Sequence, residues 1–268
     1  MLAAVLILGG IGSSTQHPIA SAQRIADIPS ASQGNPFLLL SQLLLSIVLS
    51  GALVVFPVAR RSDAPRTGKA RFFVYFAGLG LGFIFIEVSS IQKLALFLGQ
   101  PVYSLTVTLF SLLVFTGLGS LLFAGRLAPD DARAWRIPLG VVAALGLFLF
   151  GSSFCVSHLI GLPLALRICL AVLLLAPLGL LLGVPFAHGL RVASAHHPAL
   201  TSWAWAINGS MSVVGSILTV VLSMNFGFTV VMCSAALVYV VAFWALLGRP
   251  RLLAFTMTGA SAQAGTAE

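Results

Sequence analysis

Long apolar runs dominate this chain of 268 residues and restrict it to one class of fold. The hydrocarbon core of a bilayer is about 30 Å thick, and an α-helix of about 20 residues crosses it. Seven stretches of that length are almost free of charge: Phe37–Val58, Phe72–Gln92, Val102–Gly125, Ile137–Val156, Leu162–Val184, Trp203–Met224 and Phe226–Leu247. Only 7% of the residues are charged, whereas a soluble domain carries roughly a quarter. The sequence therefore predicts an all-α fold, a polytopic transmembrane bundle of about seven helices.

The basic residues fall mainly in alternate loops, and this pattern predicts the orientation of the helices. Cytoplasmic loops of membrane proteins are enriched in Lys and Arg. The loops after the first, third and fifth runs, and the segment after the seventh, hold most of these residues: Arg60, Arg61, Arg66, Lys69, Arg71, Arg126, Arg133, Arg136, Arg191, Arg249 and Arg251. We therefore expect the N-terminus outside and the C-terminus in the cytoplasm.

Three parts of the chain follow from this topology. Residues 1–36 are predicted to be an extracytoplasmic segment, residues 37–247 the membrane domain, and residues 248–268 a cytoplasmic and largely disordered tail. The apolar stretch Leu2–Ile11 is too short to span a bilayer, and with Ala20-Ser21-Ala22 it is compatible with a signal peptide. No Lys or Arg precedes that stretch, which argues against a signal peptide.

Glu87 is the one acidic residue that falls inside a predicted span. A carboxylate that faces lipid costs about 2.5 kcal/mol or more, so Glu87 should face the interior, pair with a cation or donor, or be protonated. Lys93 lies about 240° around the helix from Glu87, so the two should not pair directly, and Lys93 should reach the outer interface. Glu87, Gln92 and Lys93 are candidate contacts for a substrate or ion. Alternatively, Glu87 is a hydrogen-bonded strut between helices.

A second group of polar residues opens the sixth run. Trp203 and Trp205 stand where an aromatic belt at the membrane interface is expected. Asn208 enters the membrane, where Ser212 and Ser216 form a pair of small residues that lets helices approach closely. Helix packing is the favoured interpretation of this run, and a ligand-lining helix with Asn208 as a contact is the alternative.

Pairs of glycines at a spacing of four indicate two further packing faces. Gly78 and Gly82 lie in the second run, and Gly179 and Gly183 lie in the fifth. The glycines from Gly78 to Gly82 superficially match a dinucleotide-binding fingerprint. A true fingerprint follows a strand in a soluble βαβ unit, so nucleotide binding is rejected.

The sequence contains no self-sufficient set of catalytic or metal-binding residues. His188, His196 and His197 are expected in a solvated cytoplasmic loop, and adjacent histidines point apart. No serine triad, phosphate loop or pair of carboxylates is present. We expect no cofactor, no metal and no nucleic-acid partner, and no enzymatic activity of the chain on its own.

Several motifs together resemble a known bacterial membrane family. They are Tyr75–Phe83 followed by Glu87, Gln92 and Lys93, then Leu96–Leu105, Gly117–Ser120, Gly183–Phe186 with Gly189–Arg191, and Trp203–Trp205 with Asn208-Gly209. Over roughly Asn35 to Leu247 the chain is similar to the C-terminal membrane module of the large spermidine-synthase-like membrane proteins of bacteria. The resemblance implies a multi-pass protein of the bacterial inner membrane.

Two departures limit what this resemblance implies. Family members usually have a histidine where Gln100 stands. Their soluble aminopropyltransferase-like domain, which lies between membrane segments, has no counterpart in this chain. Enzymatic function is therefore not carried over.

Three functional hypotheses remain from the sequence. The first is a non-catalytic membrane module that acts as a subunit or anchor. Its predicted partners are the lipid bilayer and either another protein or a second copy of the chain. The second is a transporter or channel for a cation or polyamine that uses Glu87. The third is the membrane part of an aminopropyltransferase-like enzyme, which depends on the resemblance alone.

Overall fold

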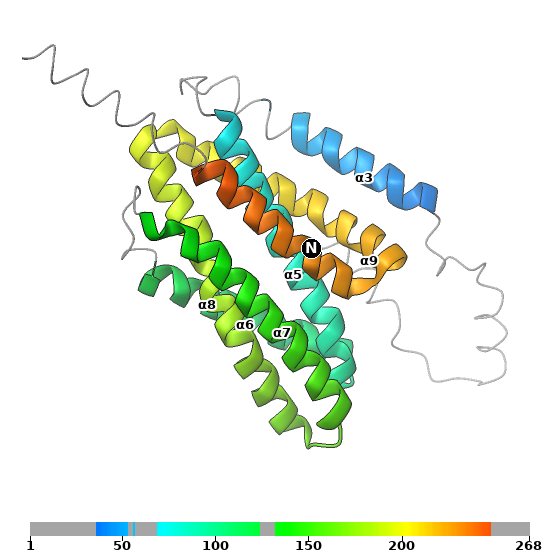
Figure 1. Ribbon diagram of the computed structural model, residues 1–268. Coiled ribbons are helices and arrows are strands. Elements are labelled where there is room, and N and C mark those ends of the chain that lie inside the picture. The colour runs from blue at the N-terminus through cyan, green and yellow to red at the C-terminus, as the bar shows by residue number, and fades with distance from the viewer. Residues whose placement is uncertain (1–35, 53–55, 57–68, 124–131, 248–268) are drawn as a thin grey trace, which may run out of the picture. The chain divides into compact units, whose positions relative to one another are not determined.

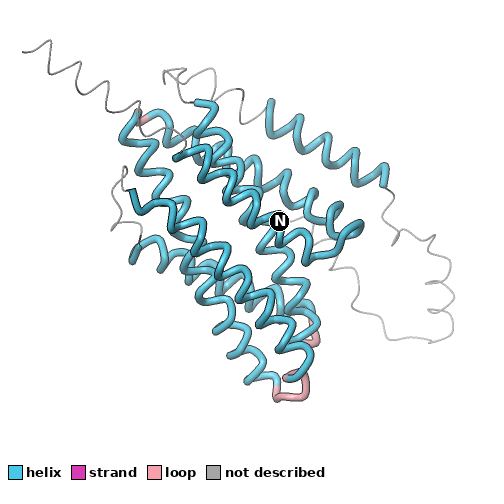
Figure 2. Tube along the Cα trace, in the orientation of Figure 1, coloured by secondary structure: helices cyan, strands magenta, loops and turns pink. Residues whose placement is uncertain are grey.

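The computed structural model describes residues 36–52, 56, 69–123 and 132–247. These residues form six α-helices, a short 3-10 turn and tight loops, and they contain no strand (Figure 2). The helices are α3 (Pro36–Ser50), α5 (Lys69–Leu98), α6 (Pro101–Phe123), α7 (Arg136–His158), α8 (Leu164–His196) and α9 (Ala199–Leu247), and the turn η3 (Ala132–Trp135) precedes α7. The predicted all-α class is confirmed.

Five of the helices, α5 to α9, are long and apolar enough to cross a membrane. The shortest of them have 23 residues, which corresponds to about 35 Å of helix. Helix α3 is apolar but has only 15 residues. Inside hydrocarbon every backbone N–H and C=O must be paired within the protein, and a helix does this within one segment. The described chain is therefore a helical membrane bundle.

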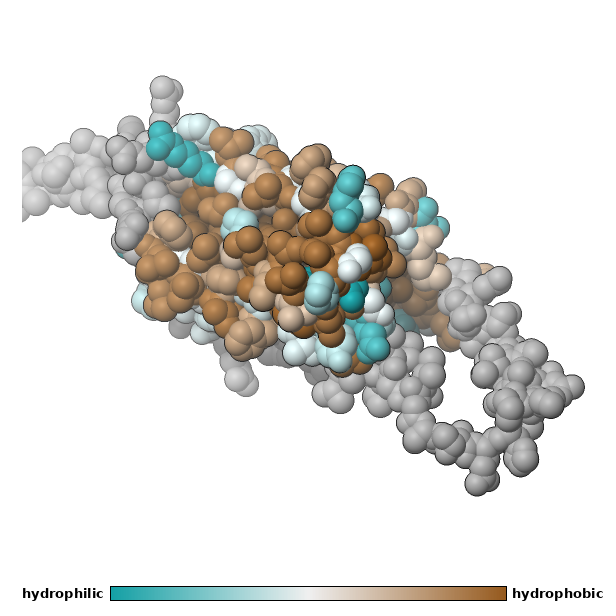
Figure 3. Space-filling model, turned by 90° about the horizontal axis from the view of Figure 1, so that it is seen from below, coloured by the Kyte–Doolittle hydropathy of each residue, from teal (hydrophilic) through white to brown (hydrophobic). Residues whose placement is uncertain are grey.

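The outer surface of this bundle is apolar. The face drawn in Figure 3 is mostly hydrophobic, with hydrophilic residues in small scattered patches. Leu121 in α6 is 80% exposed and Trp244 in α9 is 76% exposed. A contiguous apolar surface of this kind is unfavourable in water and suits contact with lipid tails.

Helix α5 lies at the centre of the bundle and packs against each of α6, α7, α8 and α9. Its most extensive contact is with α9 (Figure 1). Buried residues occur around most of its circumference, among them the fully buried Tyr75, Phe76, Ile86 and Phe97. A helix that is apolar on nearly all sides is expected in this central position.

Helix α9 consists of two arms that meet at Gly227. This residue has φ 80° and ψ 159°, a non-helical conformation that only glycine adopts without strain. The two arms run in opposite directions (Figure 1). Both reach the same stretch of α5, because the backbone of Asn208 lies against Gly80 while Ala242 lies beside Gly78. The last two apolar runs, which only Asn225 separates in the sequence, therefore form a hairpin.

Helix α8 corrects one prediction from the sequence. The fifth apolar run was expected to end at Val184, but α8 continues through Pro185 to His196. The prediction that His188 lies in a solvated loop is wrong, because His188 lies within α8 and is only 1% exposed. Proline removes one helical hydrogen bond, yet transmembrane helices tolerate it where neighbouring helices pack around it.

Several predictions fall outside the described residues. These are the signal peptide and extracytoplasmic segment before residue 36, the disordered tail after residue 247, and most of the basic residues between the first two runs. Part of the first predicted span also lies there, because the helix α3 ends at Ser50 and residues 53–55 and 57–68 are not described.

Candidate functional site

Glu87 lies in a seam on α5 between two neighbouring helices. Gly215 of α9 lies against Ile84, because a Cβ on Gly215 would be 3.5 Å from the Cβ of Ile84. On the other side, the hydroxyl of Ser104 in α6 donates a hydrogen bond to the carbonyl oxygen of Ile91. Glu87 is one turn from each contact and within about 60° of both around the helix. We call Ile84, Glu87 and Ile91 the seam.

The seam is partly open. Its three side chains are all half-buried, although most of their neighbours on α5 are buried. The reason lies in the helix arrangement: α6 and α9 both pack against α5 but make at most a marginal contact with each other. The carboxylate is therefore neither sealed in the core nor fully exposed at the surface.

Helix α6 brings a buried hydroxyl to the level of Glu87. Helices α5 and α6 are antiparallel, so residues further along α6 face residues earlier on α5. Ser104 contacts Ile91, and Thr108, one turn further, therefore lies at the level of Glu87. Thr108 is fully buried, and its hydroxyl makes no hydrogen bond to any part of the chain that the structure describes.

The first arm of α9 supplies a second hydroxyl at this level. Asn208 donates to the carbonyl oxygen of Phe76 at 3.4 Å, and Ser212 donates to that of Gly80 at the same distance. From the first of these bonds to the second, the residue number rises by the same amount in both helices, so this arm runs parallel to α5. The same register places Thr219 at the level of Glu87. Thr219 is fully buried and donates its proton to the carbonyl oxygen of Gly215, so its oxygen can still accept.

Glu87 has no counter-charge within the described ranges. It is the only acidic residue in them, and no hydrogen bond or ion pair joins it to another residue there. The predicted absence of a direct pair with Lys93 agrees with this geometry. Chemically, the seam offers the two carboxylate oxygens of Glu87 with hydroxyl oxygens at the same level of the bundle, which suit a cation or a hydrogen-bond donor.

The four predicted contact residues do not converge on one point. Asn208 faces Phe76, which is eleven residues from Glu87 and thus about 16 Å away along α5. Gln92 is exposed on a different side of the helix. Lys93 lines a groove against α7. Only Glu87 belongs to the seam.

The predicted packing glycines lie at helix contacts. On α5, a Cβ at Gly78 would be 2.9 Å from the Cβ of Ala242, and one at Gly82 would be 2.8 Å from the ring of Tyr239. On α8, a Cβ at Gly179 would be 2.7 Å from the Cβ of Phe115. At Gly183 it would overlap the backbone carbonyl of Thr116, so α6 and α8 approach too closely there for any side chain.

The remaining predicted residues of α9 differ in their surroundings. The hydroxyl of Ser212 has two acceptors within reach, the carbonyl oxygen of Asn208 in its own helix at 2.9 Å and that of Gly80 in α5 at 3.4 Å. Ser216 donates within its own helix to the carbonyl oxygen of Val213. Trp203 is 9% exposed and belongs to the core, while Trp205 is 59% exposed and packs edge-on against Phe186.

Sequence reasoning missed the buried hydroxyls around the seam. Ser90 in α5 and Thr108 and Ser111 in α6 are all at most 1% exposed, with hydroxyl groups that find no partner among the described residues. The spacing of Ser104, Thr108 and Ser111 puts the three hydroxyls on one face of α6. That periodicity, inside an otherwise apolar run, was the available signal.

No group of three or more His, Cys, Asp or Glu residues that could hold a metal ion occurs in the described part of the chain. The chain also matches no protein-family model, no curated protein and no solved structure. The similarity to the spermidine-synthase-like membrane module therefore stays a prediction from the motifs.

Proposed function

We propose that the chain is a non-catalytic module of the bacterial inner membrane that acts as a subunit or anchor of a larger membrane assembly. The observation that supports this function is the half-buried carboxylate of Glu87, which is open to the outside of the bundle at the seam. A charged residue left against lipid costs about 2.5–3.5 kcal/mol. A donor or cation on a partner's transmembrane helix removes that cost when the partner fills the seam between α6 and α9.

We further propose a topology of seven spans with the N-terminus outside and the C-terminus in the cytoplasm. The first span contains α3, and the two arms of α9 are the sixth and seventh. The alternation of basic loops supports this orientation. The division of α9 at Gly227 supports the count, since each arm has the length of one span.

The test compares the wild type with Glu87→Gln after gentle extraction from its native membrane. The glutamine keeps the size of the side chain and removes its charge. We expect the wild type to run in a complex by native mass measurement and the variant to run mainly as the single chain. Gln92→Leu is the matched control, because Gln92 is an exposed polar residue of the same helix outside the seam.

Two results contradict this proposal. A wild-type protein that is a single chain in every mild detergent and in nanodiscs has no stable partner. Identical complexes for the wild type and Glu87→Gln show that the carboxylate does not hold the assembly.

The family resemblance suggests one partner for direct testing. A separately encoded aminopropyltransferase-like protein is the natural candidate, because the similar proteins carry such a domain in the same chain. Co-expression of the two proteins, followed by native mass measurement with and without Glu87→Gln, tests this pairing.

A second candidate function is transport of a cation or polyamine through the seam. The buried Thr108 hydroxyl at the level of Glu87 favours it, because both groups present oxygen to a cation inside the membrane. Proteoliposomes with the wild type should take up labelled spermidine or a monovalent cation, and Glu87→Gln should abolish the uptake. Unchanged uptake in that variant contradicts transport through Glu87. Loss of uptake in a variant that stays in its complex separates this function from the first.

A further inference from the structure

A groove of about 240 Å³ lies between α5 and α7, separate from the seam. Lys93 and Leu96 of α5 form one side of it, and Ser152, Ser153, Val156 and Ser157 of α7 form the other. The side chain of Lys93 lies about 120° around α5 from Glu87, so the two sites open in different directions.

The hydroxyl groups of this groove are oriented by the helix that carries them. Ser152 and Ser153 both donate to the carbonyl oxygen of Leu149, at 3.1 and 2.9 Å, and Ser157 donates to that of Ser153 at 2.9 Å. Ser152 is only 2% exposed, so its oxygen belongs to the floor of the groove. These bonds are local to α7, and each hydroxyl can rotate to donate its proton to a bound anion in place of the carbonyl oxygen.

Lys93 brings a positive charge that nothing in the described chain neutralises. No carboxylate or hydrogen-bond acceptor in residues 36–52, 56, 69–123 or 132–247 pairs with it, and its only described acidic neighbour on α5 lies on another side of the helix. The side chain is only half-exposed, so water does not surround it completely. The ammonium group of Lys93 in this setting favours the binding of an anion.

A second cation lies one turn further along the same side of α5. Arg167, near the start of α8, donates from one guanidinium nitrogen to the carbonyl oxygen of Phe97 at 2.9 Å. Phe97 follows Lys93 by four residues, which is about 6 Å along the helix. The buried Nε of Arg167 has no hydrogen-bond partner within the described residues. Two positive charges therefore lie at this end of the bundle.

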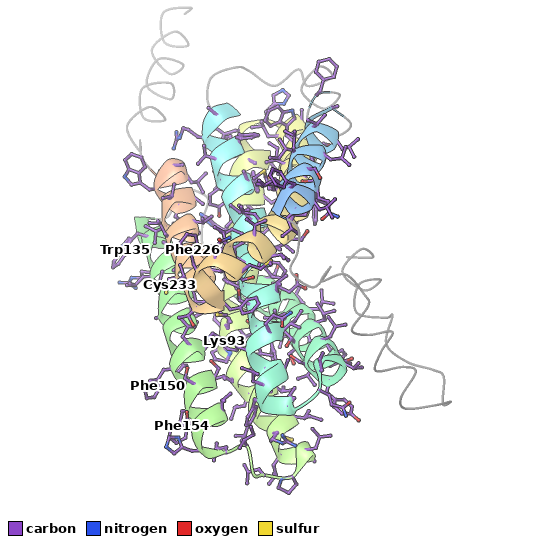
Figure 4. The ribbon with its side chains drawn as sticks, turned by 90° about the vertical axis from the view of Figure 1, so that its right-hand side faces the viewer. Lys93, Trp135, Phe150, Phe154, Phe226 and Cys233 are labelled. Atoms are coloured by element: carbon purple, nitrogen blue, oxygen red, sulfur yellow. The ribbon has the colours of Figure 1, made fainter. Side chains whose placement is uncertain are left out.

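The flanks of the groove are apolar and face outward. Leu96, which lines the groove, is 67% exposed. Phe150 and Phe154 lie elsewhere on the surface of α7 and are 75% and 49% exposed. Figure 4 shows both phenylalanines projecting away from the bundle on α7, while Lys93 lies between helices. A ligand in the groove thus contacts the positive charge of Lys93 and the serine hydroxyls, and an apolar surface lies beside these groups.

We propose that this groove binds the phosphate of an anionic phospholipid headgroup, with Lys93 as the cation, the serine hydroxyls of α7 as neutral donors and acyl chains along Leu96 and Val156. Charge complementarity selects an anion, and the apolar flanks select one that carries lipid chains. This site does not depend on Glu87 or on the proposed assembly function.

The test measures lipid retention by native mass spectrometry after purification into nanodiscs of mixed phosphatidylglycerol and phosphatidylcholine. The wild type should retain phosphatidylglycerol in preference to phosphatidylcholine. Lys93→Gln should lower that retention about tenfold, the loss expected when one charge-assisted hydrogen bond is removed. Lys93→Arg should keep most of the retention, because it preserves the charge.

Matched controls distinguish a site from general attraction to a basic protein. Arg136→Gln removes the same charge from an exposed position at the start of α7, at the other end of that helix. It should leave retention unchanged. Ser153→Ala with Ser157→Ala should weaken retention without a change in charge. Equal losses for Lys93→Gln and Arg136→Gln, or no loss for Lys93→Gln in a folded protein, overturn the proposal.

A soluble competitor separates a lipid from a small anion. Inorganic phosphate at millimolar concentration should not displace the retained phosphatidylglycerol, because it gains nothing from the apolar flanks. Full displacement by inorganic phosphate, or binding of phosphate with no preference for phosphatidylglycerol, shows a site for small anions and overturns the lipid assignment.

Discussion

The hydroxyl of Tyr75 in α5 donates a hydrogen bond of 2.6 Å to the carbonyl oxygen of Pro185 in α8. The ring of Tyr75 lies directly on Gly189, one turn further along α8, where a Cβ would overlap it. Tyr75 also packs edge-on against Phe243 of α9. One buried side chain thus holds α8 and α9 against the central helix, at the place where proline weakens α8.

Tyr75→Phe should destabilise the bundle while leaving its shape unchanged. The variant loses one interhelical hydrogen bond, which contributes about 0.5–1.5 kcal/mol and in membrane proteins averages about 0.6 kcal/mol. Reversible unfolding in mixed micelles measures the change. Tyr103→Phe, at an exposed position 41% accessible, is the control. Equal stabilities of the two variants would contradict a role for the Pro185 contact.

Gly183→Ala should separate α6 from α8. The new methyl would overlap the backbone of Thr116, which cannot move without the whole helix. Such overpacking costs about 1–3 kcal/mol. Gly117→Ala provides the comparison, because a Cβ at Gly117 meets nothing within 4 Å. We expect a lower Tm for the first variant and an unchanged or slightly higher Tm for the second. A neutral Gly183→Ala would mean that the helices do not approach this closely.

Gly227→Ala should weaken the hairpin of α9 although space is available for the methyl group. No atom lies within 4 Å of a Cβ at this position, so any loss arises from the backbone conformation at φ 80°. Strain of this kind costs about 1–3 kcal/mol. Gly209→Ala, at a helical position with equal space, should be neutral. The measurement is the unfolding free energy of the two variants, and equal values would contradict a strained turn at Gly227.

Arg71→Gln should loosen the end of α9. The guanidinium of Arg71 donates to the carbonyl oxygens of Ala245 and Leu246. These carbonyls are among the last four of the helix and have no helical partner. Hydrogen exchange of residues 242–247 should become faster in this variant, while Arg136→Gln leaves it unchanged. Equal exchange in both variants contradicts a cap by Arg71.

Helix existence could be predicted from the sequence, but helix length could not. The second run was expected to cover Phe72–Gln92, yet α5 covers Lys69–Leu98. Hydropathy excludes Arg71 and Lys93 from a span, whereas the folded helix accommodates both. Arg71 reaches the carbonyls of α9, and Lys93 lies in the groove beside α7.

The candidate site was predicted in part. Glu87 stands out in the sequence because a carboxylate within an apolar run is costly wherever it points. Thr108 and Thr219 did not stand out, because single hydroxyls are common in transmembrane helices. Their place at the level of Glu87 depends on the register of α6 and α9 against α5. Asn208 was grouped with Glu87 from its polarity alone, and the same register separates the two.

The order of the amino acids alone is enough to establish a helical protein suited to lipid, since each long apolar run must satisfy its own backbone there. Which helices become neighbours is a different matter. Lipid tails are as apolar as leucine, so hydropathy does not choose partners between helices. The neighbours are determined by close backbone approach at Gly80 and Gly183 and by individual hydrogen bonds such as that from Tyr75 to Pro185. The position of Glu87 in an open seam follows only from them.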